Sequence, residues 1–184
     1  MASSFTIEET ARRIGNYQWL EMRLFEVLGG WIQTIPELEV KVMLARHCYH
    51  HAWHAQLWHT VLPGLPQGGP GSLTVPANEH LEALVRALGD HQGPDSTTEK
   101  LVGVYRVLLP MAIAAYQVHL SRASDVADGP AKRCLGIVLA DERADVGEGE
   151  ALLGSLIDTE AKGRRASDHQ GALEAILASA EGAG

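Results

Sequence analysis

Apolar residues recur at alternating steps of three and four along four long stretches of the chain. This spacing places them on one face of an α-helix. The stretches predict helices at about residues 7–31, 37–62, 98–124 and 131–162. No stretch alternates between apolar and polar residues with the period of two that marks a half-buried strand. The chain is therefore expected to adopt an all-α fold.

A long Gly- and Pro-rich connection at residues 63–98 separates the first two helices from the last two. Its first half, LPGLPQGGPGSLTVP, is expected to be loop, and a short amphipathic helix is expected at about 78–88. Another short helix is expected at 168–180. Two hairpins joined by one crossover predict a four-helix bundle with extra short helices. The whole chain, 1–184, is expected to be one domain with its core at about 7–162.

Charge and composition exclude several classes of partner. The net charge of −8 argues against binding to nucleic acid or to an anionic membrane, both of which need a basic face. The first residues, MASSFTIEETARR, lack the apolar core of a secretory signal. The longest apolar run, 107–116, is too short to cross a bilayer. Two isolated cysteines suit a reducing compartment, so a cytoplasmic protein is expected.

Polar residues interrupt the apolar stripe of each long helix near its middle. A buried charge or an unpaired imidazole is unfavourable by several kcal/mol when isolated, so such residues on four helices require partners. A metal ion or a dense hydrogen-bonded network is the simplest partner. The core-facing polar residues are Glu21, His51, His54, His119, Glu142 and Asp145.

Two pairs of these residues share one spacing. His51 and His54 are three residues apart, as are Glu142 and Asp145. Residues three apart lie on the same helix face and can hold one ion. Five of the nine histidines lie between residues 47 and 59. His47 is expected to support the site, whereas His50 and His59 are expected to point away from the apolar stripe.

The stretches HCYHHAWHAQLW and LADERADVGEGEALL, together with the expected topology, resemble the ferritin-like di-metal carboxylate superfamily. The resemblance implies that Glu21 matches the glutamate of the first helix in that family. It also implies that His54 matches the histidine of the second helix and Glu142 the glutamate of the fourth.

Three positions depart from the family pattern. His51 stands where the second helix would carry a glutamate, and Asp145 where the fourth would carry a histidine. The third helix offers His119 or Gln117 instead of a glutamate. Fewer carboxylates neutralise two divalent cations less well, so a single Fe(II), Mn(II) or Zn(II) on His51, His54 and one carboxylate is also chemically sensible. A metal-free site, in which imidazoles and carboxylates neutralise one another, stays open.

The resemblance implies an oxidase or oxygenase that uses one or two ions of non-haem iron or manganese on a small organic substrate. The expected ligands are Glu21, His51, His54, Glu142 and Asp145. His119 is expected as a ligand or proton donor and Tyr116 as a hydrogen-bonding or electron-carrying residue, although packing also explains both. The loop at 63–75 is expected to cover the site.

Two alternatives belong to other functional classes. The first is a metal-free ferritin-like scaffold or partner subunit of a biosynthetic complex. The second is a metal-free enzyme that uses the His and carboxylate cluster for acid–base catalysis. In each case a homodimer, or a hetero-oligomer with a biosynthetic partner, is expected.

Overall fold

The computed structural model describes residues 4–64 and 70–179, and all regular elements in these ranges are helical. This confirms the all-α prediction for the described residues. A π-helical turn, η3 (Gly103–Leu108), joins α4 to α5, and the short 3-10 turns are η1 (Pro70–Ser72) and η2 (Pro94–Ser96). The α-helices are α1 (Ile7–Thr34), α2 (Leu38–Val61), α3 (Glu79–Asp90), α4 (Thr97–Val102), α5 (Leu109–Arg122), α6 (Gly129–Leu156) and α7 (Glu160–Ala178).

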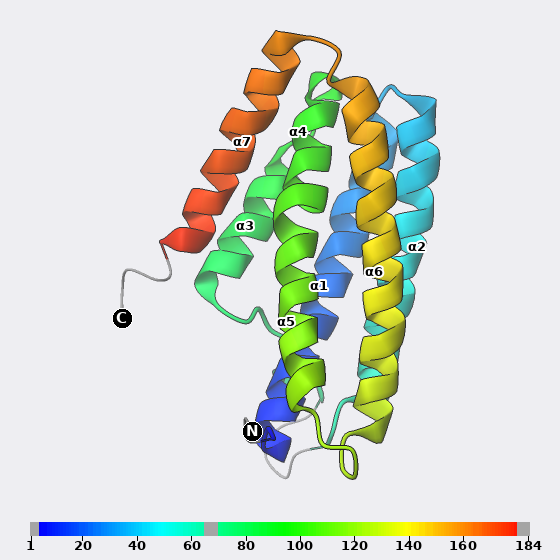
Figure 1. Ribbon diagram of the computed structural model, residues 1–184, viewed down its shortest axis with the longest axis vertical. Helices are drawn as coiled ribbons and strands as arrows, with labels where there is room; N and C mark the ends of the chain where they lie inside the picture. Colours follow the sequence, from blue (N-terminus) through cyan, green and yellow to red (C-terminus); the bar gives the residue numbers. More distant parts are fainter. Residues whose placement is uncertain (1–3, 65–69, 180–184) are drawn as a thin grey trace.

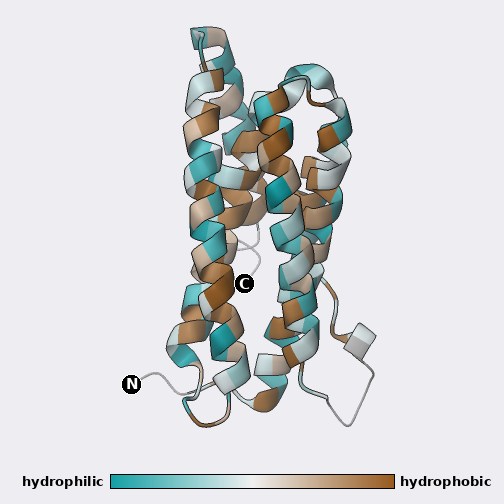
Figure 2. Ribbon diagram, turned by 90° about the vertical axis from the view of Figure 1, so that its right-hand side faces the viewer, coloured by the Kyte–Doolittle hydropathy of each residue, from teal (hydrophilic) through white to brown (hydrophobic). Residues whose placement is uncertain are grey.

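The long helices lie side by side (Figure 1). α1 packs on α2, α2 on α6, and α6 on α5, while α3 and α7 pack together beside α4. Apolar and polar residues alternate around each helix (Figure 2), so the apolar stripes meet in a shared interior. Fully or almost fully buried side chains of this interior include Ile14, Leu24, Leu28, Trp31, Leu44, Trp58, Leu135 and Val138.

The fourth long helix ends earlier than the sequence pattern predicted. α6 ends at Leu156 and α7 begins at Glu160, instead of one helix to 162 and a separate one from 168. The early start of α7 follows from a helix cap, because the Thr159 hydroxyl accepts a hydrogen bond of 3.2 Å from the Lys162 amide in its first turn. The expected loop cover includes residues 65–69, and the expected last helix includes residue 180; both lie outside the described residues.

The third long helix contains the π turn directly before Pro110. The Leu109 amide bonds to the Val104 carbonyl, five residues back. Proline lacks an amide hydrogen, and its ring crowds the carbonyl four residues earlier, here that of Arg106. The wider turn lies where Pro110 predicted a bend, and it carries Tyr105.

The crossover is anchored on α1. A Cβ atom added at Gly15 would lie 2.2 Å from the Leu73 carbonyl oxygen, so glycine permits this close approach of two backbones. Beside it, Asn16 Nδ2 donates a hydrogen bond of 2.9 Å to the Val75 carbonyl. The chain entering α3 is therefore held against the first half of α1.

One helical segment, Pro94–Arg122, is long and apolar enough to cross a membrane by length and composition. It extends well beyond the apolar run at 107–116, which alone is too short to cross a bilayer. In this structure 56% of its most apolar window is buried. A core helix of a soluble protein passes the same test, so the segment is weak evidence for membrane insertion.

Candidate metal centre

Four side chains from three helices bring their polar atoms together in the interior. Glu21 comes from α1, His51 and His54 from α2, and Glu142 from α6. One imidazole nitrogen or carboxylate oxygen of each lies within 4.8 Å of the others. All four side chains are at most 1% exposed. We call these residues the inner cluster.

The separations within the inner cluster suit one metal ion. His51 Nδ1 lies 2.7 Å from Glu21 Oε2 and 3.4 Å from Glu142 Oε1. His54 Nδ1 lies 3.6 Å and 3.4 Å from the same two oxygens. Ligands about 2.0–2.1 Å from a tetrahedral ion are about 3.3 Å apart, close to three of these four separations, while the 2.7 Å pair is at hydrogen-bond distance.

Several of these atoms are without a hydrogen-bond partner among the described residues. They are His54 Nδ1 and both carboxylate oxygens of Glu142, all buried. The 3.4 Å separations are ion-pair distances without hydrogen-bond alignment. A buried carboxylate without hydrogen bonds is costly, and an ion coordinated there would satisfy it. The inner cluster therefore fits a divalent cation.

Tyr116 of α5 fixes the orientation of Glu21. Its hydroxyl donates a hydrogen bond of 2.7 Å to Glu21 Oε1, which leaves Oε2 facing the two histidines. Burial raises the pKa of Tyr116 well above 10, and the charges of Glu21 and Glu142 raise it further. Tyr116 is therefore a phenol that donates to the carboxylate at any ordinary pH.

Asp141 orients the second histidine. His54 Nε2 lies 3.1 Å from Asp141 Oδ2, and the Asp141 side chain is 30% exposed. An Nε2–H that donates to this carboxylate leaves Nδ1 free to face the inner cluster. His51 lacks such support, since its Nε2 is buried with no hydrogen-bond partner among the described residues.

Opposite charges offset burial in the inner cluster. Burial raises the pKa of Glu21, but the hydrogen bond from His51 and the positive charges of His51 and His54 outweigh it and lower this pKa to about 2. Burial lowers the histidine pKa values, but Glu142 and Glu21 outweigh it and raise them to about 10 for His51 and about 11 for His54. Without metal, both imidazoles are therefore protonated at neutral pH.

Asp145, the remaining predicted ligand, lies outside the inner cluster. Its carboxylate is 2.9 Å from His50 Nδ1 and 3.3 Å from His47 Nε2. His47 Nε2 is also 3.1 Å from Glu148, and the Tyr105 hydroxyl is 2.6 Å from His47 Nδ1. We call these residues, His47, His50, Tyr105, Asp145 and Glu148, the outer network.

A neutral His47 satisfies the outer network. Burial lowers the pKa of His47 despite the nearby carboxylates. The Tyr105 hydroxyl then donates to Nδ1, and Nε2–H donates to Glu148. Tyr105 has room for its ring because α6 carries glycine there, and a Cβ atom at Gly149 would lie 2.3 Å from the Tyr105 ring.

His119, expected as a ligand or proton donor, also lies outside the inner cluster. Its ring packs against Phe5 and Tyr17, with ring centroids 5.5 and 5.6 Å apart. Both ring nitrogens are buried without a hydrogen-bond partner among the described residues. Burial and the charge of Arg13 lower the pKa of His119 to about 4, so its imidazole is neutral at neutral pH.

Comparison with known proteins identifies no relative. The sequence matches no protein-family model, no curated protein and no solved structure. The assignment of a candidate metal centre therefore rests on the geometry of the site alone.

Sequence patterns missed the carboxylates that support the histidines. Along α2 the residue numbers rise as those of facing α6 residues fall, so His47 faces Glu148, His50 faces Asp145 and His54 faces Asp141. This antiparallel register brings the half-buried His50, expected to point away from the core, onto Asp145. Only the pairing of α2 with α6 would have revealed these contacts. The apolar stripe of a single helix carries no information about that pairing.

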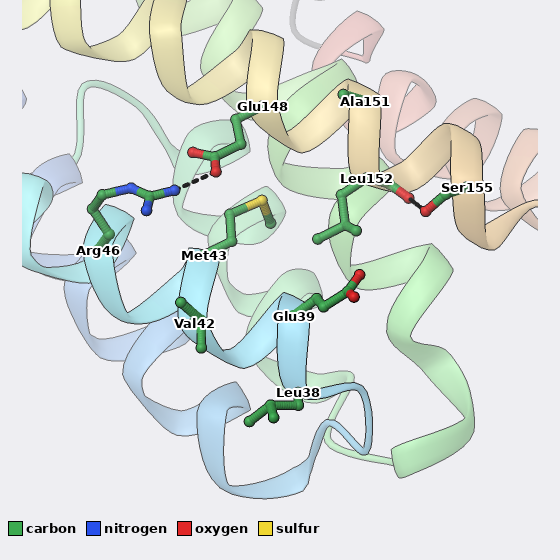
Figure 3. Close-up of a pocket in the computed structure, with 9 residues that line it drawn as sticks. All are labelled: Leu38, Glu39, Val42, Met43, Arg46, Glu148, Ala151, Leu152 and Ser155. Carbon is green, nitrogen blue, oxygen red and sulfur yellow. Dashed lines mark hydrogen bonds and ion pairs between the residues drawn. The ribbon is translucent and has the colours of Figure 1, made fainter.

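A surface groove of about 560 Å³ runs along the outer side of this region, between α2 and α6. Figure 3 shows Arg46 and Glu148 forming an ion pair at the groove, beside Met43. Glu148 thus connects the groove to the outer network. No inner-cluster residue lines the groove.

Proposed function

We propose that the inner cluster binds one divalent transition-metal ion and that the protein is a ferritin-like, non-haem metal-dependent oxidase or oxygenase of a small organic substrate. One observation carries this proposal. Two imidazole nitrogens and two carboxylate oxygens from α1, α2 and α6 converge within 4.8 Å in a buried site. Mixed imidazole and carboxylate ligands suit iron or manganese.

The ferritin-like assignment rests on topology and ligand placement. α1 and α2 form one hairpin, a long crossover follows, and α5 and α6 form another. Ferritin-like metalloproteins place their ligands on the inward faces of such helices. Glu21, His51, His54 and Glu142 have this placement.

A non-haem iron or manganese ion held by these four residues would supply the activation of dioxygen. The chain's own residues prepare the site. Tyr116 holds Glu21 through one oxygen, and Asp141 sets the tautomer of His54. The burial of all four ligands excludes bulk water and strengthens electrostatic interactions there.

The proposal is tested by loading the chelator-treated protein with Fe(II) without oxygen and then adding oxygen. We expect iron to bind and an absorption change to follow. His54→Ala removes a ligand and should abolish both, whereas His59→Ala, at the exposed end of the same helix, should retain both. Failure of the wild-type protein to bind iron, with no absorption change, would overturn the proposal.

A metal-free protein is the second candidate, and the charge balance favours it. Two protonated imidazoles and two carboxylates neutralise one another, with the closest pair, His51 and Glu21, 2.7 Å apart. Such a protein would be a scaffold or partner subunit, or an acid–base enzyme. In the enzyme, His54→Ala would abolish turnover with no metal-dependent signal to lose.

The cellular setting is also a proposal. A cytoplasmic location agrees with the free thiols of Cys48 and Cys134. We also propose assembly as a homodimer or with a biosynthetic partner. Size-exclusion chromatography with light scattering measures the assembly directly.

A further inference from the structure

A largely apolar cavity of about 250 Å³ lies between α1, α3, α5 and α7, separate from the surface groove of Figure 3. Its apolar walls include Leu20, Leu81, Ala112 and Leu177. Small-molecule pockets are ordinarily about 300–1,000 Å³, so this one suits a ligand smaller than a typical drug.

Tyr116, which orients Glu21 of the inner cluster, also lines this cavity. The Tyr116 side chain lines the cavity, and its hydroxyl donates to Glu21. Tyr17 lines the cavity beside it, with ring centroids 4.7 Å apart. A molecule in the cavity is therefore one tyrosine away from a proposed metal ligand.

The cavity lining also carries a positive charge. Arg13 lines both this cavity and a more open recess next to it, which Arg12 also lines. No aspartate or glutamate lines either space among the described residues. In a chain of net charge −8, this cavity is a place where an anion meets arginine without a competing carboxylate.

Arg13 has no carboxylate partner among the described residues. Its guanidinium lies 4.1 Å from the centroid of the Phe5 ring and interacts with the Tyr17 hydroxyl, whose pKa it lowers against the larger effect of burial. Three other polar side chains of the lining are engaged with the protein. Asn16 donates to Val75, Asn78 accepts from the Leu81 amide, and His80 Nδ1 lies 3.1 Å from the Ser179 hydroxyl.

We infer that this cavity binds a small apolar carboxylic acid, with its carboxylate at Arg13 and its hydrocarbon against the apolar walls. Guanidinium and carboxylate form charge-assisted, often paired hydrogen bonds, which are stronger than neutral ones. Transfer of the ligand's hydrocarbon from water to the apolar walls makes the free energy of binding more favourable. That the acid is the substrate rests on the proposed function, whereas its binding needs no metal.

The test is calorimetric titration of the metal-free protein with octanoate, compared with octanamide as a neutral probe of equal length. Octanoate is expected to bind at least about tenfold more tightly than octanamide, since only the carboxylate forms a charge-assisted bond. Arg13→Gln should remove this preference, while Arg143→Gln, on the exposed side of α6, should keep it. Equal affinity for both probes, or no binding of octanoate, would overturn the inference.

A second pair of variants tests the cavity without altering charge. Ala115 lines the cavity, whereas its neighbour Ala114 is exposed and does not. Ala115→Leu should fill the cavity and weaken octanoate binding at least about tenfold, while Ala114→Leu should not. This pair decides the question if Arg13→Gln fails to fold. Unchanged binding in Ala115→Leu would overturn the inference.

Metal analysis of the same preparations separates this inference from the proposed function. If the protein binds octanoate but takes up no metal, the proposed acid site is supported and the proposed metal centre is wrong. If the protein takes up metal but does not bind octanoate, the proposed metal centre is supported and the proposed acid site is wrong.

Discussion

The Tyr116 hydroxyl lies 2.7 Å from Glu21 Oε1, so one side chain of α5 both lines the apolar cavity and holds a carboxylate of the inner cluster. Glu21 thereby offers its second oxygen to His51 and His54. This contact connects the proposed substrate site to the proposed metal site.

Tyr116→Phe should weaken metal binding while keeping the aromatic packing. Loss of a hydrogen bond to a ligand typically lowers metal affinity about 10–100-fold. The unpaired Glu21 oxygen should also lower the free energy of unfolding of the metal-free protein by about 1–3 kcal/mol. Competition with a chromogenic chelator and urea unfolding measure the two effects.

Tyr17→Phe is the matched control, since the Tyr17 hydroxyl interacts with Arg13 and donates a 3.4 Å bond to the Ala115 carbonyl rather than to an inner-cluster residue. Its metal affinity should stay near that of the wild type. Equal losses in Tyr17→Phe and Tyr116→Phe would show that Tyr116 has no special role in holding Glu21.

Glu142→Gln and Asp145→Asn should separate the inner cluster from the outer network. Glu142 faces both histidines of the cluster, so Glu142→Gln should abolish stoichiometric metal binding. Asp145 contacts His47 and His50 instead, so Asp145→Asn should lower stability but retain one bound ion per chain. The reverse pattern, measured by elemental analysis, would make Asp145 the ligand.

The metal-free protein should lose stability as pH rises from about 6.5 through the folded-state histidine pKa values. Those pKa values, about 10 for His51 and about 11 for His54, exceed the unfolded value of 6.5. Their contribution is therefore complete below pH 6.5 and declines above it. Glu21, with its pKa lowered to about 2 from 4.5, contributes above pH 4.5 and loses that contribution in acid.

Metal binding should have the opposite pH dependence, because ligation requires neutral imidazole. Loading the inner cluster at pH 7 should release up to two protons, one from each histidine, measured by calorimetry in buffers of different ionisation enthalpy. Metal binding with no proton release, or metal-free stability that rises from pH 7 to 10, would contradict the assigned charge states.

Gly149→Ala should destabilise the protein while Gly147→Ala stabilises it, although both lie in α6. A Cβ atom at Gly149 would overlap the Tyr105 ring, and overpacking of this kind lowers the free energy of unfolding by about 1–3 kcal/mol. Gly147 has no atom within 4 Å of the added Cβ, so alanine there should add about 0.5–1 kcal/mol through helix propensity. Thermal unfolding of both variants is the measurement, and destabilisation by Gly147→Ala would argue against this packing.

Periodicity was enough to predict the all-helical class and the inward position of the four inner-cluster residues. Glu21, His51, His54 and Glu142 occupy core-facing positions of their helices, and a residue on the apolar stripe must point inward. The π turn before Pro110 was not predictable in the same way, since it depends on how the chain relieves crowding at Arg106.

The contacts between helices could not be predicted from the periodicity of each helix. Asp145 shares the inward face of Glu142, but the antiparallel register of α2 and α6 sets it level with His50. The same register brings Asp141 to His54. The start of α7 at Glu160 depended on a local cap at Thr159, which the continuing apolar pattern concealed.

The most direct test of the metal centre is elemental analysis of the purified protein after equilibration with Fe(II) or Mn(II) and removal of free metal. We predict about one ion per chain in the wild type, one in Asp145→Asn, and none in His54→Ala. A wild-type protein that retains no ion under these conditions would contradict the account and leave the inner cluster as a self-neutralised, metal-free network.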